Sequence, residues 1–292
     1  MKLIQQIAET ALAQSAGNLS LQPVMGGCVN DAYRLDATSG ESYFLKVNQN
    51  ADAALFDAEK HGLDLIRTAG CIRVPNVIKQ GVFADQFSYL LMEFLPFERA
   101  TRESDKALGR ALAQMHQHTA DQHGLEVENF IGLTPQPNYQ QKKWCDFYRQ
   151  NRLQFQLEIA LSKGAQRDLT DPCNHVIDAL DALLADHEPT PSLLHGDLWS
   201  GNVGVISGGE PVIFDPAVYF GDRETDIAMT ELFGGFSNAF YQGYNEIYPL
   251  HVDYQKRRPL YQFYHSLNHF NLFGAGYERQ VKMHAELALA AL

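Results

Sequence analysis

Residues 193–215, LLHGDLWSGNVGVISGGEPVIFD, place an acid, an amide and a second acid among short apolar runs. Asp197 and Asn202 are five residues apart, and Asp215 ends the run VIF. A tight turn between strands would account for the Gly, Asp and Asn residues, but it does not call for a second acid after a β-branched and aromatic run. Phosphoryl transfer requires such a second acid. One carboxylate accepts the proton of an attacking hydroxyl, while an amide oxygen and another carboxylate hold magnesium on a nucleotide.

Composition limits the kinds of protein to which this segment can belong. The chain has 292 residues, 45% of them hydrophobic, which is enough for a sizeable core in one large domain or two lobes. Its 23 Lys and Arg and 35 Asp and Glu give a formal net charge of -12. Proteins that follow nucleic-acid phosphates carry a basic face, so we expect no nucleic-acid partner.

The N-terminal residues and the cysteines indicate a cellular compartment. Residues 1–17 alternate apolar and polar side chains at helical spacing and lack the apolar run of a secretory signal, and no later segment suits a membrane span. The cysteines show neither CxxC spacing nor the histidine pattern of a zinc site; they are Cys28, Cys71, Cys145 and Cys173. We therefore expect a cytoplasmic protein without membrane contact, whose oligomeric state the sequence leaves open.

The first third of the chain predicts short strands around one long helix. After a helix at the start, β-branched and aromatic runs predict strands at residues 21–25, 32–35, 42–47, 77–83 and 87–94. Apolar residues at helical spacing predict a helix over 52–69, which Gly70 ends. Lys46 lies in the third strand and Glu59 in the helix.

Helical patterns dominate the remainder. We expect helices over 104–119, 144–161 and 176–185, and mainly helical sequence from Asp226 onward with an aromatic stretch at 261–273. Pro96 ends the last strand because proline cannot continue a sheet ladder. This shift places a boundary between a nucleotide-binding lobe, residues 1–94, and a catalytic and acceptor-binding lobe, residues 95–292.

The order of these parts resembles the protein-kinase-like fold in its small-molecule kinase branch. The predicted class is α+β, with a small N-terminal antiparallel sheet lobe that carries a helix and a larger, mainly helical C-terminal lobe. In that fold the strand lysine neutralises nucleotide phosphates and the helix glutamate holds the lysine, which are the places of Lys46 and Glu59. Alone, each would be interpreted as a solvated surface charge; the downstream acids favour the functional reading.

Two further segments fit nucleotide binding. A glycine hairpin precedes the strand lysine, and its backbone amides would donate to phosphates, although such hairpins also occur for structural reasons; it comprises Gly26, Gly27, Cys28, Val29 and Asn30. The hinge follows the fifth strand, where backbone groups of Glu93 and Leu95 would bond the adenine edge and Met92 would pack behind it. These hinge residues are Met92, Glu93, Phe94 and Leu95.

The sequence motifs around these acids are more specific than the acids themselves. HGDLWSGN, PVIFDPA, ELFGGF and LNHFNLFGAGY, with GGCVNDAY and FLKVN near the start, resemble the fructosamine kinase family, also called ketosamine 3-kinases, over nearly the whole chain. The resemblance implies ATP- and magnesium-dependent phosphorylation of the sugar 3-hydroxyl of a free or protein-bound ketosamine, such as a fructosamine, ribulosamine or erythrulosamine. The phosphorylated adduct then releases the free amine, so the role is deglycation.

Two alternatives stay open at this point. One is a kinase of the same fold that acts on an aminoglycoside or amino alcohol, since those enzymes share the HGD and Asn/Asp framework but usually carry another residue at the place of Trp199. The other is a nucleotide-binding pseudokinase that regulates a partner. The intact acids, amide, lysine and glutamate speak against the pseudokinase.

Residue roles carry over as follows. Asp197 would be the base, Asn202 and Asp215 the magnesium ligands, and Lys46 with Glu59 the phosphate clamp. His195 and Asp226 would brace the catalytic loop. The acceptor side is less specific. Trp199 could wall the sugar or pack in the interior, and the insertion between the lobes could line the pocket through Gln136, Asn138, Trp144, Phe147 and Arg152, although packing in a core helix is favoured for Trp144 and Phe147.

Overall fold

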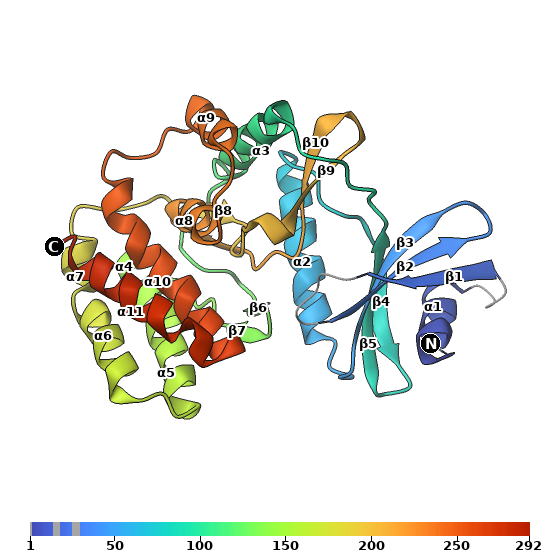
Figure 1. Ribbon diagram of the computed structural model, residues 1–292, viewed down its shortest axis with the longest axis horizontal. Helices are drawn as coiled ribbons and strands as arrows, with labels where there is room; N and C mark the ends of the chain where they lie inside the picture. The colour runs from blue at the N-terminus through green and yellow to red at the C-terminus, as the bar shows by residue number, and fades with distance from the viewer. Residues whose placement is uncertain (1, 14–17, 25–29) are drawn as a thin grey trace.

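The computed structural model describes residues 2–13, 18–24 and 30–292. A five-stranded antiparallel sheet forms one end of the molecule, with strand order β1-β2-β3-β5-β4 (Figure 1). Its strands are β1 (Leu19–Pro23), β2 (Asp31–Ala37), β3 (Ser42–Asn48), β4 (Val77–Phe83) and β5 (Phe87–Glu93). Helix α1 (Lys2–Leu12) precedes the sheet, and α2 (Ala54–Ala69) is inserted between β3 and β4.

Both faces of the interior strand β5 are buried, and its successive side chains point to opposite faces of the sheet. Tyr89 and Leu91 join an apolar cluster that contains the inner face of α1. Leu90 and Met92 join a different cluster, which contains Phe56, Leu63 and Ile66 of α2. Helix α2 therefore packs with the second, larger core and not with the α1 side of the sheet.

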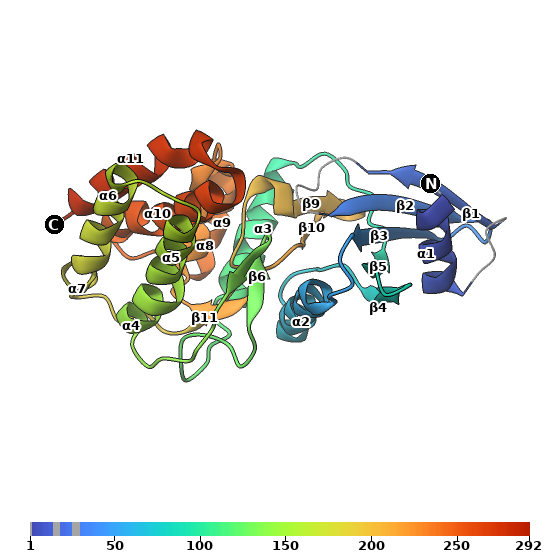
Figure 2. The ribbon, with the colours of Figure 1, turned by 90° about the horizontal axis from the view of Figure 1, so that it is seen from below.

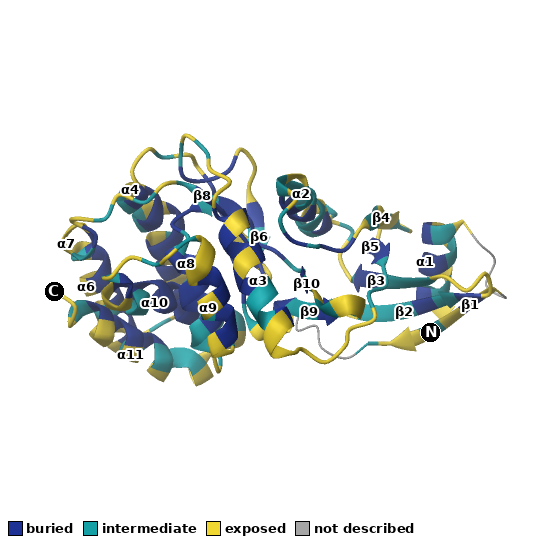
Figure 3. Ribbon diagram, turned by 90° about the horizontal axis from the view of Figure 1, so that it is seen from above, coloured by how far each residue is buried: buried dark blue, intermediate teal, exposed yellow. Residues whose placement is uncertain are grey.

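The remainder of the chain is mainly helical and surrounds that larger core (Figures 1 and 3). Its helices are α3 (Arg102–Met115), α4 (Trp144–Tyr148), a π-helical turn η2 (Arg149–Gln154), α5 (Phe155–Ser162), α6 (Arg167–Asp178), α7 (Leu180–Leu183), α8 (Glu224–Leu232), α9 (Asn238–Ile247), α10 (Tyr254–Phe273) and α11 (Glu278–Leu289). None of the helices described is both long and apolar enough to cross a lipid bilayer.

The chain also forms three short two-stranded sheets, of which β9 and β10 lie beside the large sheet while β11 lies among the helices (Figure 2). They pair β6 (Asn129–Ile131) with β7 (Thr134–Gln136), β8 (Ser192–Leu194) with β11 (Tyr219–Gly221), and β9 (Val203–Ile206) with β10 (Glu210–Ile213). The predicted acid and amide positions fall in the loops that leave β8 and β10. These small sheets therefore fix the loops that carry chemistry.

Most elements agree with the sequence prediction. The five strands are present, with shifts of up to two residues at their ends, and Gly70 ends α2 in the left-handed conformation with φ 71°. The helix expected over 144–161 contains an unpredicted π-helical turn. Helix α6 begins nine residues before the predicted position 176 because Pro172 inside it obscured the pattern. The hairpin β6–β7 was not predicted.

Candidate active site

Asp226 fixes the loop that carries the predicted base. One carboxylate oxygen of Asp226 accepts the His195 N–H at 2.7 Å, and the other accepts the Gly196 N–H at 2.8 Å. His116, at the end of α3, contacts the same carboxylate through Nε2 at 3.1 Å. Gly196 has φ 83°, and a Cβ there would lie 2.0 Å from the Ala217 carbonyl oxygen. Only glycine fits this close backbone approach.

His195 links Asp197 to Phe214, the residue before Asp215, and these contacts define the tautomer of its ring. Its Nε2 lies 3.0 Å from the Phe214 carbonyl oxygen, which can only accept, so Nε2 carries the proton. Its Nδ1 accepts the Asp197 N–H at 3.2 Å. Burial lowers the pKa of His195, so the ring stays neutral and keeps this arrangement. The histidine is a brace, as expected from the sequence.

Asn202 and Asp215 lie beside Asp197, as phosphoryl transfer requires. The Asn202 Nδ2 donates to the Asp197 carbonyl oxygen at 2.8 Å and to its carboxylate at 3.3 Å, which leaves the amide oxygen of Asn202 for another ligand. Asp215 follows β10 with φ 56°, a left-handed conformation that aspartate tolerates better than most residues. Carboxylate and amide oxygens are the hard donors that Mg²⁺ prefers, so the donor set fits this ion.

Lys46 joins the large sheet to this set. Its Nζ lies 2.7 Å from Glu59 and 2.5 Å from Asp215, and the lysine is only 7% exposed. Burial lowers the pKa of Lys46, but the two carboxylates outweigh burial and hold that pKa above its usual range. Burial raises the pKa of Glu59 to about 7 against the opposing effect of the lysine charge. The two side chains predicted to form the phosphate clamp are therefore paired, and Lys46 also contacts Asp215, the predicted metal ligand.

The electrostatics of Asp197 suit a general base. Burial raises the pKa of its carboxyl to about 7, the charge of Asp215 adds to the rise, and the hydrogen bond from Asn202 opposes it. A base of this strength accepts a proton from a hydroxyl more readily than an ordinary aspartate does, and it remains ionised in half of the molecules near neutral pH.

The hinge segment leaves β5 where expected. Met92 is buried, and the Leu95 N–H has no hydrogen-bond partner among the described residues, so it is free to donate to a nucleotide base. The Glu93 carboxylate instead binds Arg73 through both oxygens, at 2.6 and 2.7 Å, and the Asn76 N–H. Arg73 was not predicted, because nothing in its local sequence points to a partner twenty residues away.

Most of the glycine hairpin, Gly26, Gly27, Cys28 and Val29, lies outside the described residues. Its last member, Asn30, accepts a hydrogen bond from the Asn48 side chain at 2.7 Å. This bond ties the end of the hairpin to β3, two residues beyond Lys46.

The model of a family described as fructosamine kinase matches residues 1–291. The chain belongs to the fructosamine kinase family. A probable ketoamine kinase of Synechocystis is 45% identical over 96% of this chain and 93% of its own length. The chloroplastic protein-ribulosamine 3-kinase of Arabidopsis thaliana is 41% identical over 87% of this chain and 78% of its own length.

Solved structures agree with this assignment. The crystal structure of a putative fructosamine-3-kinase from Haemophilus somnus superposes with a TM-score of 0.87 at 30% identity, covering 98% of this chain and 96% of the other. The aminoglycoside phosphotransferase APH(4)-Ia superposes with a TM-score of 0.67 at 17% identity, covering 99% and 98% of the two chains, which shows the shared fold alone. The α+β protein-kinase-like fold is therefore confirmed.

Three residues expected on the acceptor side of this fructosamine kinase family member lie in the interior. Asn138 and Trp144 are 1% exposed and Arg152 is 0% exposed. Trp144 donates from its indole nitrogen to the Tyr261 hydroxyl at 3.1 Å and packs among aromatic rings. A side chain without accessible surface cannot touch a substrate in this conformation, so their expected acceptor contact was wrong and packing is the role that fits. Gln136 and Phe147 are buried in the same way.

Trp199 is partly exposed, lies two residues after Asp197 and begins an aromatic cluster. Its ring meets Phe233 edge to face at 6.4 Å, and Phe233 lies 4.7 Å from His269. His269 is within 5.5 Å of Phe273 and 5.1 Å of Tyr277. The segments ELFGGF and LNHFNLFGAGY supply four of these five rings, so segments distant in sequence meet at Trp199, two residues after the predicted base.

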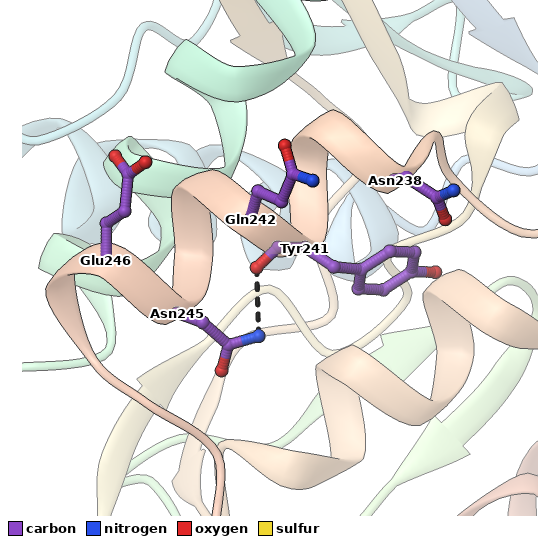
Figure 4. A pocket seen from close by; sticks show the side chains of 5 residues that line it. All are labelled: Asn238, Tyr241, Gln242, Asn245 and Glu246. Carbon is purple, nitrogen blue, oxygen red and sulfur yellow. Dashed lines mark hydrogen bonds between the residues drawn. The ribbon is translucent and has the colours of Figure 1, made fainter.

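A surface hollow on α9 lies apart from this chemistry. It is lined by polar side chains of that helix together with Tyr241 (Figure 4), namely Asn238, Tyr241, Gln242, Asn245 and Glu246. None of them belongs to the base, metal or clamp set. The Asn245 amide donates back to the Tyr241 carbonyl oxygen at 2.9 Å, as a helix-surface residue does.

Proposed function

We infer that this protein is an ATP-dependent ketosamine kinase, which transfers a phosphoryl group to the 3-hydroxyl of a sugar joined to an amine. The observation that carries the inference is the joint placement of Asp197, Asn202 and Asp215 with the Lys46 and Glu59 pair, in a chain of the fructosamine kinase family. Relatives named ketoamine kinase and protein-ribulosamine 3-kinase support the ketosamine acceptor.

Asp197 is the base in this proposal. Its carboxylate accepts the proton of the sugar 3-hydroxyl as the oxygen forms a bond to the terminal phosphorus of ATP, and the bond from that phosphorus to the bridging oxygen breaks to release ADP. Lys46, steadied by Glu59, neutralises phosphate charge. Most of the acceleration comes from positioning and charge neutralisation, with proton transfer supplying a smaller part.

Magnesium is held by Asn202 and Asp215, and it supplies charge neutralisation on the phosphates. The hinge from Met92 to Leu95 and the glycine hairpin hold the nucleotide. The Lys46 contact with Asp215 supports a shared phosphate and metal region, because a single ammonium group already joins the clamp to the metal carboxylate.

The sugar is received by the aromatic cluster of Trp199, Phe233, His269, Phe273 and Tyr277. Flat apolar faces pack against the C–H faces of a sugar, and their negative potential attracts the ammonium group of a ketosamine. The His269 Nδ1 donates to the His265 carbonyl oxygen at 2.8 Å, so Nε2 presents a lone pair to a sugar hydroxyl.

The physiological setting follows from the product. A 3-phosphorylated ketosamine releases its amine, so the reaction reverses glycation of proteins or metabolites. We place the protein in the cytoplasm, with no nucleic-acid or membrane partner, on the basis of the net charge of -12 and the scattered cysteines. The Arabidopsis relative is named chloroplastic, so compartments differ within the family.

A substrate panel tests this function. The protein is incubated with magnesium ATP and fructoselysine, ribuloselysine, an aminoglycoside or choline, and phosphorus NMR locates any new phosphate ester. We expect a 3-phosphate on the ketosamines alone, and no product from Asp197→Asn protein. Phosphorylation of only the aminoglycoside or choline would replace the ketosamine assignment with the alternative acceptor, and full turnover by the variant would remove Asp197 from the mechanism.

A further inference from the structure

The segment after the metal carboxylate touches the loop that carries the base. The Ala217 N–H donates to the His195 carbonyl oxygen at 2.8 Å, and the Ala217 carbonyl oxygen occupies the space that a Cβ on Gly196 would need. Asp215 is two residues before Ala217, and Asp197 is two residues after His195. A displacement of residues 217–218 would therefore change the placement of Asp197 relative to Asp215.

Two buried amides of the β6–β7 hairpin hold this segment. The Gln136 Nε2 donates to the Ala217 carbonyl oxygen at 3.1 Å, and the Asn129 Nδ2 donates to the Val218 carbonyl oxygen at 2.6 Å. Gln136 is 2% exposed and Asn129 is 4% exposed, so water does not replace either donor readily.

Arg152 determines, through Asn138, which way the Asn129 amide points. A guanidinium group can only donate, and its Nη2 donates to the Asn138 Oδ1 at 2.8 Å. The Asn138 Nδ2 must then point the other way, and it donates to the Asn129 Oδ1 at 2.9 Å. The Asn129 amide is oriented in turn, with its Nδ2 toward the Val218 carbonyl. Three hydrogen bonds thus run in one direction from a permanent cation to the backbone beside the active site.

The placement of Arg152 is unusual for a residue that only fills space. Its other described hydrogen bonds go to the neutral carbonyl oxygens of Pro137 and Asn151, and its guanidinium lies over the Tyr219 ring at 4.0 Å. Within the described chain it has no carboxylate partner. A buried cation without a counter-ion is costly, and here it lies in the π-helical turn η2, a local irregularity that is frequent at functional sites.

We propose that Arg152, Asn138 and Asn129 form a donor chain that, together with the Gln136 amide, positions residues 217–218, and through them the base relative to the metal carboxylate. These four are positioning residues and do not touch substrate. The proposal rests on the function inferred above. If Asn129, the last residue of the donor chain, is converted from a donor to an acceptor, kcat should fall. The Michaelis constants for ketosamine and magnesium ATP should stay nearly unchanged.

Asn129→Asp tests this directly. The new carboxylate keeps the donors from Gln136 and Asn138, but it has no N–H for the Val218 carbonyl. The control is Asn271→Asp, which also puts a carboxylate at a buried amide that donates to a carbonyl oxygen, that of Gln156 at 2.8 Å. It is the more severe change, because the Asn271 Oδ1 is buried without a described hydrogen-bond partner. At temperatures well below both melting points we expect kcat to fall about tenfold or more for Asn129→Asp only.

A gentler pair of variants applies if Asn129→Asp does not fold. Tyr264 donates to the Gln136 Oε1 at 3.0 Å and so orients the second amide, whereas Tyr148 donates to the Leu260 carbonyl oxygen at 3.3 Å. Each Phe substitution removes one buried hydroxyl. We expect kcat to fall about threefold for Tyr264→Phe and to stay unchanged for Tyr148→Phe. Arg152→Lys, which keeps a donor, should retain more kcat than Arg152→Met.

The outcomes separate this proposal from the inferred function. Wild-type ketosamine turnover is measured first; if it is absent, the same variants are compared by magnesium-dependent ATP hydrolysis, in which water is the acceptor. Equal kcat losses in test and control variants, or unchanged kcat in Asn129→Asp and Tyr264→Phe, overturn the donor chain. A loss confined to the Michaelis constant of the ketosamine would overturn it too, because that result marks a binding role.

Discussion

At the scale of single residues, the raised pKa of Asp197 should lower the stability of the fold by an amount that can be measured. The pKa of Asp197 is raised to about 7, above the value of an unfolded aspartate, so the folded protein binds more protons here between the two values. Stability from this group is therefore full at low pH and is lost as pH rises through about 7.

Asp197→Asn removes this cost. In metal-free buffer we expect the variant to melt at a higher temperature than wild type at pH 8, and at nearly the same temperature at pH 4. Thermal unfolding followed by circular dichroism at both values checks this. A difference that does not change with pH would mean that the charge of Asp197 is not what destabilises the fold.

Lys46 gives a second prediction at this scale. Lys46→Met leaves Glu59 and Asp215 without their shared cation, so we expect a loss of about 3 kcal/mol in the free energy of unfolding and much weaker ATP binding. Lys60→Met is the control, because its pair with Asp64 is exposed and contributes less than about 1 kcal/mol. Urea denaturation and calorimetric titration with ATP measure both. Similar losses in the two variants would contradict a special role for Lys46.

The residues of the site were predictable to different degrees. Asp197, Asn202 and Asp215 lie in one short segment, so their spacing was visible in the sequence. Arg73 and His116 meet partners on other elements, and no local pattern indicates which arginine or histidine will do so. The burial of Asn138 and Arg152 was missed because a polar side chain is normally placed at the surface, unless its partners are known.

At the scale of elements, two glycines let α3 and α9 approach closely. A Cβ on Gly109 would lie 2.0 Å from the Phe240 carbonyl oxygen, and one on Gly243 would lie 2.2 Å from the Lys106 carbonyl oxygen. Helix α3 is followed directly by His116, which contacts Asp226, so this packing bears on the loop that carries Asp197.

Gly109→Ala should lower the free energy of unfolding by about 3 kcal/mol, because the methyl group meets backbone that cannot rotate away. Gly276→Ala is the control, since no atom lies within 4 Å of a Cβ there. Chemical denaturation compares the two variants. Equal stabilities would show that the helices separate without cost.

The elements that escaped sequence analysis have identifiable reasons. The strands of the β6–β7 hairpin are three residues long, too short for an alternating pattern to emerge. The π-helical turn η2 changes the helical period only locally, so the apolar spacing from Trp144 to Leu161 still indicated one helix. The hairpin supplies Asn129 and the π-helical turn supplies Arg152 to the proposed donor chain. The elements least visible in the sequence therefore lie next to the candidate active site.

At the scale of the whole molecule, ligand binding should stabilise the fold through contacts on both sides of the hinge. At ATP concentrations about a hundredfold above Kd, magnesium ATP should add about 2.7 kcal/mol to the free energy of unfolding. ATP with EDTA should add much less to the free energy of unfolding. In the Asp215→Asn variant, ATP should add the same amount with magnesium as with EDTA. Thermal shift measurements test this, and an equal shift with and without magnesium would remove Asp215 as a ligand.

Helix α2 lies in the first part of the chain, yet Phe56, Leu63 and Ile66 pack in the core of the second. Space beside Gly62 is likewise filled by Pro216 and Val218. A fragment cut after residue 94 would carry this apolar face into water and lack its cover. The boundary proposed after residue 94 therefore cuts through one shared core, and we expect a fragment of residues 1–94 not to fold alone. The nucleotide clamp should be secured only after Pro216 and Val218 have been synthesised.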